Sequence, residues 1–218
     1  MQRRAEPVLY PSSSFSCNKH NFIETNEKSR QIFQVNIISS LGLTCRTGDL
    51  AEVRKAIARG EDVNKKFWTG VGKKTGLMLA VECKHNSIVK LLLEQPTLDL
   101  NLTDRDGWTA LHFAASHDNV AAVKLLLADP RLNTHNHKDI MSTGYTPVMT
   151  AMVNKNVDAL RELVAHPRVD LDTRDMLGRS LEDVSRLKGG EMVRILKEAR
   201  QRRRVKAEER QQLENYQV

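Results

Sequence analysis

The sequence predicts an all-α solenoid: a stack of about five helix-turn-helix repeats with hairpin loops between them, followed by a C-terminal helical extension. Three observations predict this fold. A short motif, seen best as Thr109-Ala-Leu-His-Phe-Ala-Ala115, recurs in degenerate form at intervals of 34 to 37 residues. A second apolar cluster follows each copy of the motif. Aromatic residues make up only 5% of the chain, so the core must be aliphatic, which favours helices.

Composition points to a folded protein of the cell interior. Of its 218 residues, 40% are hydrophobic and 28% are charged, which is enough for a core and too apolar for a wholly disordered chain. The three cysteines are far apart and odd in number, which argues against a disulfide framework. No secretory signal is visible at the start, and no stretch approaches the roughly 18 apolar residues of a membrane span. We therefore expect an intracellular protein of the cytoplasm, the nucleus or both, with no membrane contact.

The formal net charge of +7 is concentrated at the two ends of the chain. Residues 197–218 carry seven Lys and Arg against four Glu, and residues 1–35 carry five against three Glu. Such basic ends are weaker support for nucleic-acid binding than a basic face on a folded domain. The domain boundaries follow from where the periodic apolar pattern begins and ends. We expect a disordered arm over 1–36, repeats over 37–196 and a basic helical tail over 197–218.

The copies of the motif predict the first helix of each unit. A threonine before a helical stretch can accept a hydrogen bond from an otherwise unpaired backbone N–H, so Thr75, Thr109 and Thr146 are predicted N-caps. Small residues inside the motif let this helix lie close to its neighbours. The other four copies are Ser39-Ser-Leu-Gly-Leu-Thr-Cys45, Thr75-Gly-Leu-Met-Leu-Ala-Val81, Thr146-Pro-Val-Met-Thr-Ala-Met152 and Ser180-Leu-Glu-Asp-Val-Ser185.

The apolar clusters predict the second helix of each unit. Each cluster forms a stripe that one unit cannot bury alone, so the units must stack. Between the two helices, Lys84, Asp118 and Lys155 stand where Gly48 and Gly189 stand in the end units, so we expect left-handed strain or another geometry there. The clusters are 53–57, 88–93, 123–127, 160–164 and 193–196.

The third unit carries a family resemblance. Asp104-Arg-Asp-Gly107-Trp-Thr109-Ala-Leu-His112-Phe-Ala-Ala115, followed by Val123-Lys-Leu-Leu-Leu127, resembles an ankyrin repeat. The resemblance covers about residues 37–196 and implies an ankyrin-repeat solenoid that recognises proteins without catalysis. The histidine of the family pattern is kept only at His112, since Met78 and Met149 replace it in the adjacent units.

The residues immediately before the caps form one column of candidate partner-binding positions: Lys74, Trp108, Tyr145 and Arg179. In a solenoid they fall on successive hairpin tips along one edge, and Arg and large aromatics are enriched in binding hot spots. Trp108 and Tyr145 either pack on neighbouring hairpins or project toward a partner. We favour projection, and so expect Trp108→Ala to weaken binding and to leave the melting temperature nearly unchanged.

The ankyrin resemblance implies a second set of partner-binding positions, on the first helices and facing the concave groove. This set is apolar in the early units and neutral-polar in the fourth, and it lacks the Lys/Arg stripe that a phosphate backbone demands. We therefore expect a protein or peptide partner for a monomeric adaptor or scaffold. The mapped residues are Leu79, Glu82, Phe113, Ser116, His117, Thr150 and Asn154.

Other chemistry has little support in the sequence. Residues 70–75 resemble the end of a phosphate loop, but Phe67 and Lys74 replace the required Gly and Ser/Thr, so we predict a flexible hairpin between the first two units. The loop of His135, His137 and Asp139 is a weak metal signal, interpreted as a solvated hairpin. With no nucleophile–base pattern, we expect no enzyme, no cofactor and no metal.

The basic cluster from Arg200 to Lys206 has three competing interpretations. It is a solvated helix end, a nuclear-import signal, or a nucleic-acid contact through Arg202, Arg203 and Arg204. We favour the first, because charge runs are usually solvated faces. The alternative function is a nuclear regulatory protein whose basic tail contacts nucleic acid while the repeats hold a protein. That contact should weaken steeply with salt.

Overall fold

The computed structural model describes residues 41–70, 72–133 and 144–216, and within them ten helices form five successive pairs. One two-stranded antiparallel hairpin, β1 (Lys66–Trp68) and β2 (Lys73–Thr75), connects the first pair to the second. The first helices of the pairs are α2 (Leu41–Thr47), α4 (Gly76–Glu82), α6 (Ala110–Ser116), α8 (Pro147–Val153) and α10 (Leu181–Lys188). The second helices are α3 (Leu50–Ala58), α5 (Asn86–Leu93), α7 (Val120–Ala128), α9 (Val157–Ala165) and α11 (Gly190–Tyr216).

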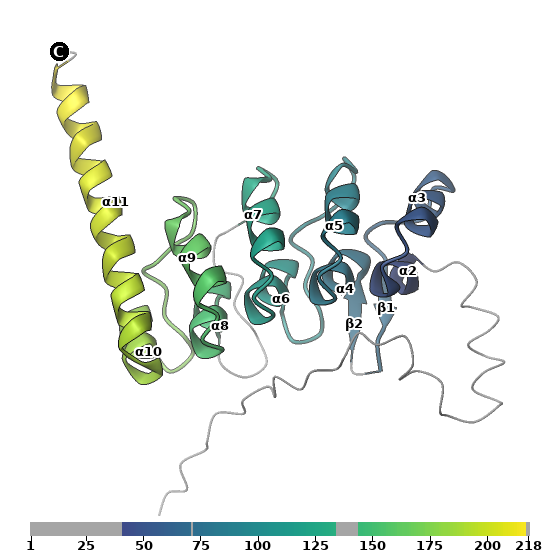
Figure 1. Cartoon of the computed structure of the whole chain (residues 1–218), viewed down its shortest axis with the longest axis horizontal. Helices are drawn as coiled ribbons and strands as arrows, with labels where there is room; N and C mark the ends of the chain where they lie inside the picture. The colour runs from purple at the N-terminus through teal and green to yellow at the C-terminus, as the bar shows by residue number, and fades with distance from the viewer. Residues whose placement is uncertain (1–40, 71, 134–143, 217–218) are drawn as a thin grey trace, which may run out of the picture.

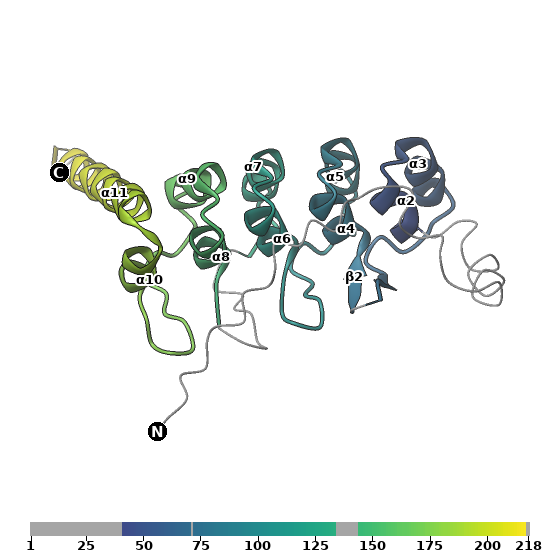
Figure 2. The ribbon, with the colours of Figure 1, turned by 60° about the horizontal axis from the view of Figure 1, so that its bottom comes forward.

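The helices form two rows, with the first helices in one row and the second helices in the other (Figures 1 and 2). Each helix contacts the corresponding helix of the next pair, so the units stack one upon another. One continuous apolar core runs from Leu41 in α2 to Ala199 in α11. The predicted all-α solenoid of five helix pairs is therefore confirmed. Within the described part of the chain, no helix is both long and apolar enough to cross a membrane.

Threonines begin the first helices, as predicted. The Thr75 and Thr146 hydroxyls accept hydrogen bonds from the backbone N–H three residues on. At Thr109 the buried His112 ring makes a different bond: its Nδ1 accepts from the backbone N–H of Thr109 itself at 3.1 Å and lies 2.9 Å from the Thr109 hydroxyl. Its Nε2 therefore carries a proton and lies 3.2 Å from the Tyr145 carbonyl oxygen of the next unit. This histidine is a structural link between units.

The turns between paired helices adopt the strained geometry that the sequence predicts. Lys84, Asp118 and Lys155 have φ angles of 58°, 50° and 58°, in the left-handed region. That region costs a residue with a side chain about 1 to 2 kcal/mol. The stacking of the second helices outweighs this cost, since side chains such as Val123 and Leu126 are fully buried between neighbouring units.

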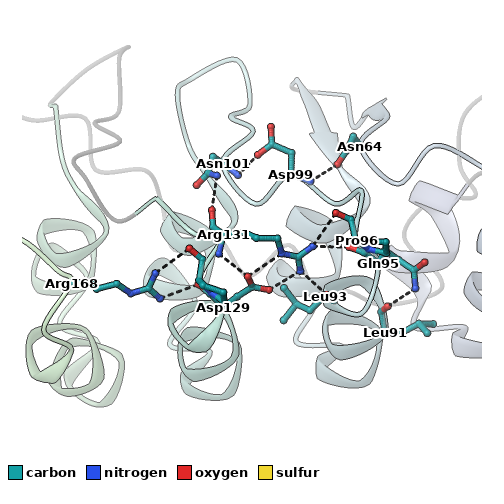
Figure 3. A network of polar contacts seen from close by, with 11 residues as sticks. Asn64, Leu91, Leu93, Gln95, Pro96, Asp99, Asn101, Asp129, Arg131 and Arg168 are labelled. Atoms are coloured by element: carbon teal, nitrogen blue, oxygen red, sulfur yellow. Dashed lines mark hydrogen bonds and ion pairs between the residues drawn. The ribbon is translucent and has the colours of Figure 1, made fainter.

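Three arginines close the C-terminal ends of second helices, each from the unit that follows (Figure 3 shows two). We call Arg131, Arg168 and Arg203 the arginine caps. The guanidinium group of each donates to backbone carbonyls that an α-helix leaves unpaired, where positive charge also suits the helix dipole. Arg131 donates to the Leu93 and Gln95 oxygens at 2.6 and 2.7 Å; Arg168 donates to those of Leu127 and Asp129; Arg203 donates to those of Val164, His166 and Val169 at 2.9, 2.6 and 2.7 Å.

Polar side chains at the starts of the second helices form another set of links. Each reaches back to a carbonyl oxygen near the end of the first helix of the preceding unit, so the two rows are connected across the first three boundaries between units. The Asn119 amide donates to the Val81 oxygen at 3.0 Å, the Asn156 amide donates to the Ala115 oxygen at 2.7 Å, and His85 Nε2 lies 3.0 Å from the Arg46 oxygen.

The repeat array extends further along the chain than the sequence boundary suggests. The predicted boundary at residue 196 cuts through α11, and Ala199 is buried against the array. Arg203, taken from sequence as part of a basic tail, caps α9. The first half of the tail is thus a structural part of the fifth unit, while the predicted arm over 1–36 lies outside the described residues.

Candidate binding surface

Lys74, Glu82 and Phe113 meet on the first-helix side of the second and third units. The Lys74 ammonium lies 2.8 Å from both carboxylate oxygens of Glu82 and 4.3 Å from the centre of the Phe113 ring. Lys74 stands on β2, directly opposite Phe67 of β1, so the hairpin fixes its backbone. Three predicted site residues from two sequence patterns therefore form one cluster.

Trp108 extends this cluster, but it does not project as we expected. Its ring packs edge-on against Phe113 at 5.2 Å between centroids and stacks on His112 at 5.9 Å. The Asp104 side chain holds the preceding turn by accepting from the Trp108 and Asp106 backbone N–H groups, and burial raises the pKa of this carboxyl despite those bonds. Because Trp108 directly precedes the helix cap, its ring lies over the following helical turn. The interpretation of Trp108 as a freely projecting tip is wrong.

His117 completes the group, with its ring 6.4 Å from that of Phe113 and its Nδ1 3.0 Å from the Phe113 carbonyl oxygen. We call Lys74, Glu82, Trp108, Phe113 and His117 the aromatic patch. It combines a cation, an anion and three rings in contact across two units.

A second group of predicted residues lies at the fourth and fifth units. Arg179 donates to the Tyr145 hydroxyl at 3.1 Å and to the Asp175 carboxylate at 2.6 Å. Asp175 also accepts from the Arg179 backbone N–H, repeating the turn that Asp104 makes two units earlier. Between the two groups, the Asn154 amide donates to the Ser116 hydroxyl at 3.1 Å.

Exposure divides the predicted site residues. Leu79, Phe113 and Thr150 are each only 4% exposed, so the expectation that they face an open groove is wrong. Stacked first helices lie too close together to leave those positions uncovered, and the Thr150 hydroxyl donates to the Thr146 carbonyl. Binding by the half-buried remainder stays a prediction: Lys74, Glu82, Trp108, Ser116, His117, Tyr145, Asn154 and Arg179.

Three exposed apolar side chains were missed by the sequence reasoning. Trp68 is 66% exposed on β1, and Met176 and Leu177 are 65% and 75% exposed in the hairpin that leads to α10. These hairpins project beyond the row of first helices, on the side away from the second helices (Figure 2). Met176 and Leu177 lie between Asp175 and Gly178, and this Asp-x-x-Gly turn was the available signal.

The basic cluster is largely used within the fold. Arg200 bridges the carboxylates of Asp172 and Glu182 at 3.0 and 2.7 Å, and Arg204 pairs with Glu208 of the same helix at 3.0 Å. Arg203 makes three bonds to carbonyls of the fourth unit, which contradicts its assignment as a nucleic-acid contact. Arg202 is exposed.

The remaining candidates for site chemistry are Cys45 and the histidine loop. Burial raises the pKa of the Cys45 thiol to about 12, so this thiol is unreactive. The loop of His135, His137 and Asp139 lies outside the described residues; the part of the chain that is described contains no group of three metal-ligand side chains.

Comparisons with known proteins support the repeat assignment. A family model described as "Ankyrin repeats (3 copies)" matches residues 41–139 and 77–175. The human SMC5-SMC6 complex localization factor protein 1 is 33% identical over 38% of this chain and 8% of its own length. A putative ankyrin repeat protein of fowlpox virus is 29% identical over 56% and 35%, and a probable E3 ubiquitin-protein ligase of rice is 38% identical over 42% and 17%. The chain thus spans about a third or less of each relative.

Proposed function

Because the chain belongs to the ankyrin-repeat family, we propose that it is a non-catalytic, monomeric adaptor or scaffold that binds a protein partner. The binding surface is the half-buried part of the aromatic patch, which the buried Phe113 ring supports from below, together with the Tyr145–Arg179 group and the hairpin tips. Ankyrin repeats suggest protein–protein interaction in general, and the choice of this surface is the specific part of the proposal. We also propose that the protein works inside the cell, in the cytoplasm or the nucleus.

The observation that carries the proposal is the preorganisation of the aromatic patch. Trp108 and Phe113 hold each other edge to face, and Lys74 is held by Glu82. Side chains that are already fixed lose little conformational entropy when a partner covers them. Half-buried Trp, Tyr and Arg are also the residue types that contribute most to protein interfaces. Both features support recognition of a protein.

The names of two relatives agree with a recognition role. One is a complex localization factor and the other a probable E3 ubiquitin-protein ligase, of which this chain covers 8% and 17%. The match covers only a small part of each relative, so neither whole-protein activity is carried over. The nucleic-acid alternative loses support because Arg203 is bonded to carbonyls within the array.

Site-specific photo-crosslinking tests the proposal. A photo-reactive benzoylphenylalanine placed at His117 or Tyr145 lies on the proposed surface, whereas the same group at Lys90 or Arg161 lies on exposed positions of the second helices. We expect one and the same protein to be crosslinked from positions 117 and 145 and not from 90 and 161. Crosslinks confined to the second helices would place the interface on the other side of the solenoid.

A further inference from the structure

The β1–β2 hairpin has one face that anchors it to the array. Phe67 packs over α2 at Gly42, where an added Cβ would lie only 2.3 Å from the Phe67 ring. Directly opposite Phe67 in the strand register, Lys74 is held by Glu82 of α4. Two contacts to different helices therefore fix the orientation of this hairpin.

The opposite face carries Lys66, Trp68 and Lys73, which we call the display face. Side chains alternate between the two faces of a strand, so Lys66 and Trp68 lie on the face of β1 opposite to Phe67. Lys73 is the register partner of Trp68, so the two side chains start side by side on this face. All three residues are exposed, and Trp68 keeps 66% of its surface open. An anchored hairpin thus presents a large aromatic ring between two cations.

The charge around Trp68 has one sign. Residues 63–75 contain four lysines and no acidic residue. Arg105, on the next hairpin, comes close to the hairpin tip, since its Cβ lies 3.7 Å from where a Cβ of Gly72 would stand, although its guanidinium group pairs with Asp106 at 3.7 Å. Like charges held this close repel one another, so a ligand that neutralises them gains binding free energy and speeds its own association.

We propose that the display face binds an acidic segment of a protein partner, with carboxylates at Lys66 and Lys73 and an apolar side chain against Trp68. This inference rests on the proposed function, and it adds the chemistry of the partner. A nucleic acid fits less well because its backbone needs a continuous basic track. The next hairpin interrupts such a track with Asp104 and Asp106.

The probe for this test is a fluorescein-labelled peptide of about twelve residues, with a central Phe-Leu pair between runs of glutamate. Its binding to the full chain is followed by fluorescence anisotropy. We expect Lys66→Glu/Lys73→Glu to weaken binding at least tenfold and Trp68→Ala at least threefold. The matched control, Lys90→Glu/Arg161→Glu, makes the same charge change at exposed sites on the second helices and should change affinity less than twofold. Circular dichroism checks that every variant is folded.

Each alternative gives a different result. Equal weakening in the control variant would mean that the net charge of +7 attracts the peptide without a site. A peptide with glutamine in place of glutamate that binds as tightly would contradict charge complementarity. A twelve-residue oligouridylate that binds tenfold more tightly than the peptide would replace the protein partner by a nucleic acid. If the partner crosslinked at position 117 binds the hairpin variants normally, this inference fails and the proposed function stands; if no protein crosslinks there, the proposed function fails regardless of the peptide result.

Discussion

The two tryptophans of the chain lie on successive hairpins and have opposite environments. Trp108 packs against His112 and Phe113, whereas Trp68 is 66% exposed. Trp108 directly precedes the cap Thr109, so its ring covers the helix that begins there. Trp68 lies seven residues before the cap Thr75, on the hairpin face opposite to Phe67. Distance from the helix cap and the face of the strand decide whether a hairpin side chain is structural or displayed.

The same contrast separates two adjacent arginines of α11. Arg203 donates to three carbonyl oxygens of the fourth unit, and Arg202 is exposed. Successive residues of an α-helix point about 100° apart around its axis, so one step along the chain changes a cap into a surface charge. Residue type alone therefore predicts neither the role of a tryptophan nor that of an arginine in this array.

The largest effect should come from Trp108→Ala. We expect it to lower the free energy of unfolding by about 2 to 3 kcal/mol, somewhat less than for a fully buried tryptophan, because the ring is half-buried. Urea denaturation followed by circular dichroism measures the change. A loss below about 0.5 kcal/mol, which is usual for an exposed site, would restore the interpretation of Trp108 as a displayed residue.

The arginine pair gives the next largest difference. Arg203→Gln removes charge-assisted hydrogen bonds at the end of α9 and should lower the free energy of unfolding by about 1 to 2 kcal/mol. Arg202→Gln, one residue earlier, should change it by less than about 0.5 kcal/mol. Equal values for the two variants in urea titrations would remove the distinction between cap and surface charge.

A pH titration extends the comparison from the arginine caps to Asp129, the carboxylate that pairs with the cap Arg131. The Arg131 guanidinium beside Asp129 lowers the pKa of that carboxyl, so the pair stabilises the fold above the ordinary Asp value of about 3.9 and this contribution is lost as the pH falls below it. Asp129→Asn should therefore be less stable than the natural protein at pH 7, by under about 1 kcal/mol. The difference should shrink in melts below about pH 4; a constant difference down to pH 3 would contradict it.

The smallest effect on stability should come from Trp68→Ala, within about 0.5 kcal/mol of the natural protein. Fluorescence reports the reason directly, because the chain has only two tryptophans. Trp108→Phe leaves Trp68 as the single emitter, and Trp68→Phe leaves Trp108. We expect acrylamide to quench the first variant more strongly. Equal quenching would mean that the two rings are equally covered.

Local features of the array could be predicted from the sequence. The period of the motif gives the five units, and Thr75, Thr109 and Thr146 give the caps of three first helices. Lys84, Asp118 and Lys155 occupy left-handed turns as predicted, since a missing glycine at a fixed place in a repeat is visible in the sequence alone. Each of these features depends on residues a few positions apart.

Features that depend on neighbouring units could not be predicted. Arg131 and Arg168 follow prolines in short polar loops, and their carbonyl partners lie 36 to 41 residues earlier in the chain. The burial of Leu79 and Phe113 reflects how closely adjacent first helices stack. That spacing cannot be predicted from the position of a residue in the motif. The exposure of Trp68 follows from the pairing of β1 with β2, and that register is not evident before the hairpin is seen.

The arginine caps also impose an order on the completion of the helices during synthesis. Each of Arg131, Arg168 and Arg203 closes a helix of the unit before its own, so α5, α7 and α9 are finished only when a later part of the chain arrives. The ribosome synthesises the chain from the N-terminus. The C-terminal ends of these helices therefore remain uncapped until the following unit, which carries the arginine, has been synthesised. A chain released early keeps its last helix without the cap, whereas a chain shortened from the other end keeps every cap of the helices that remain.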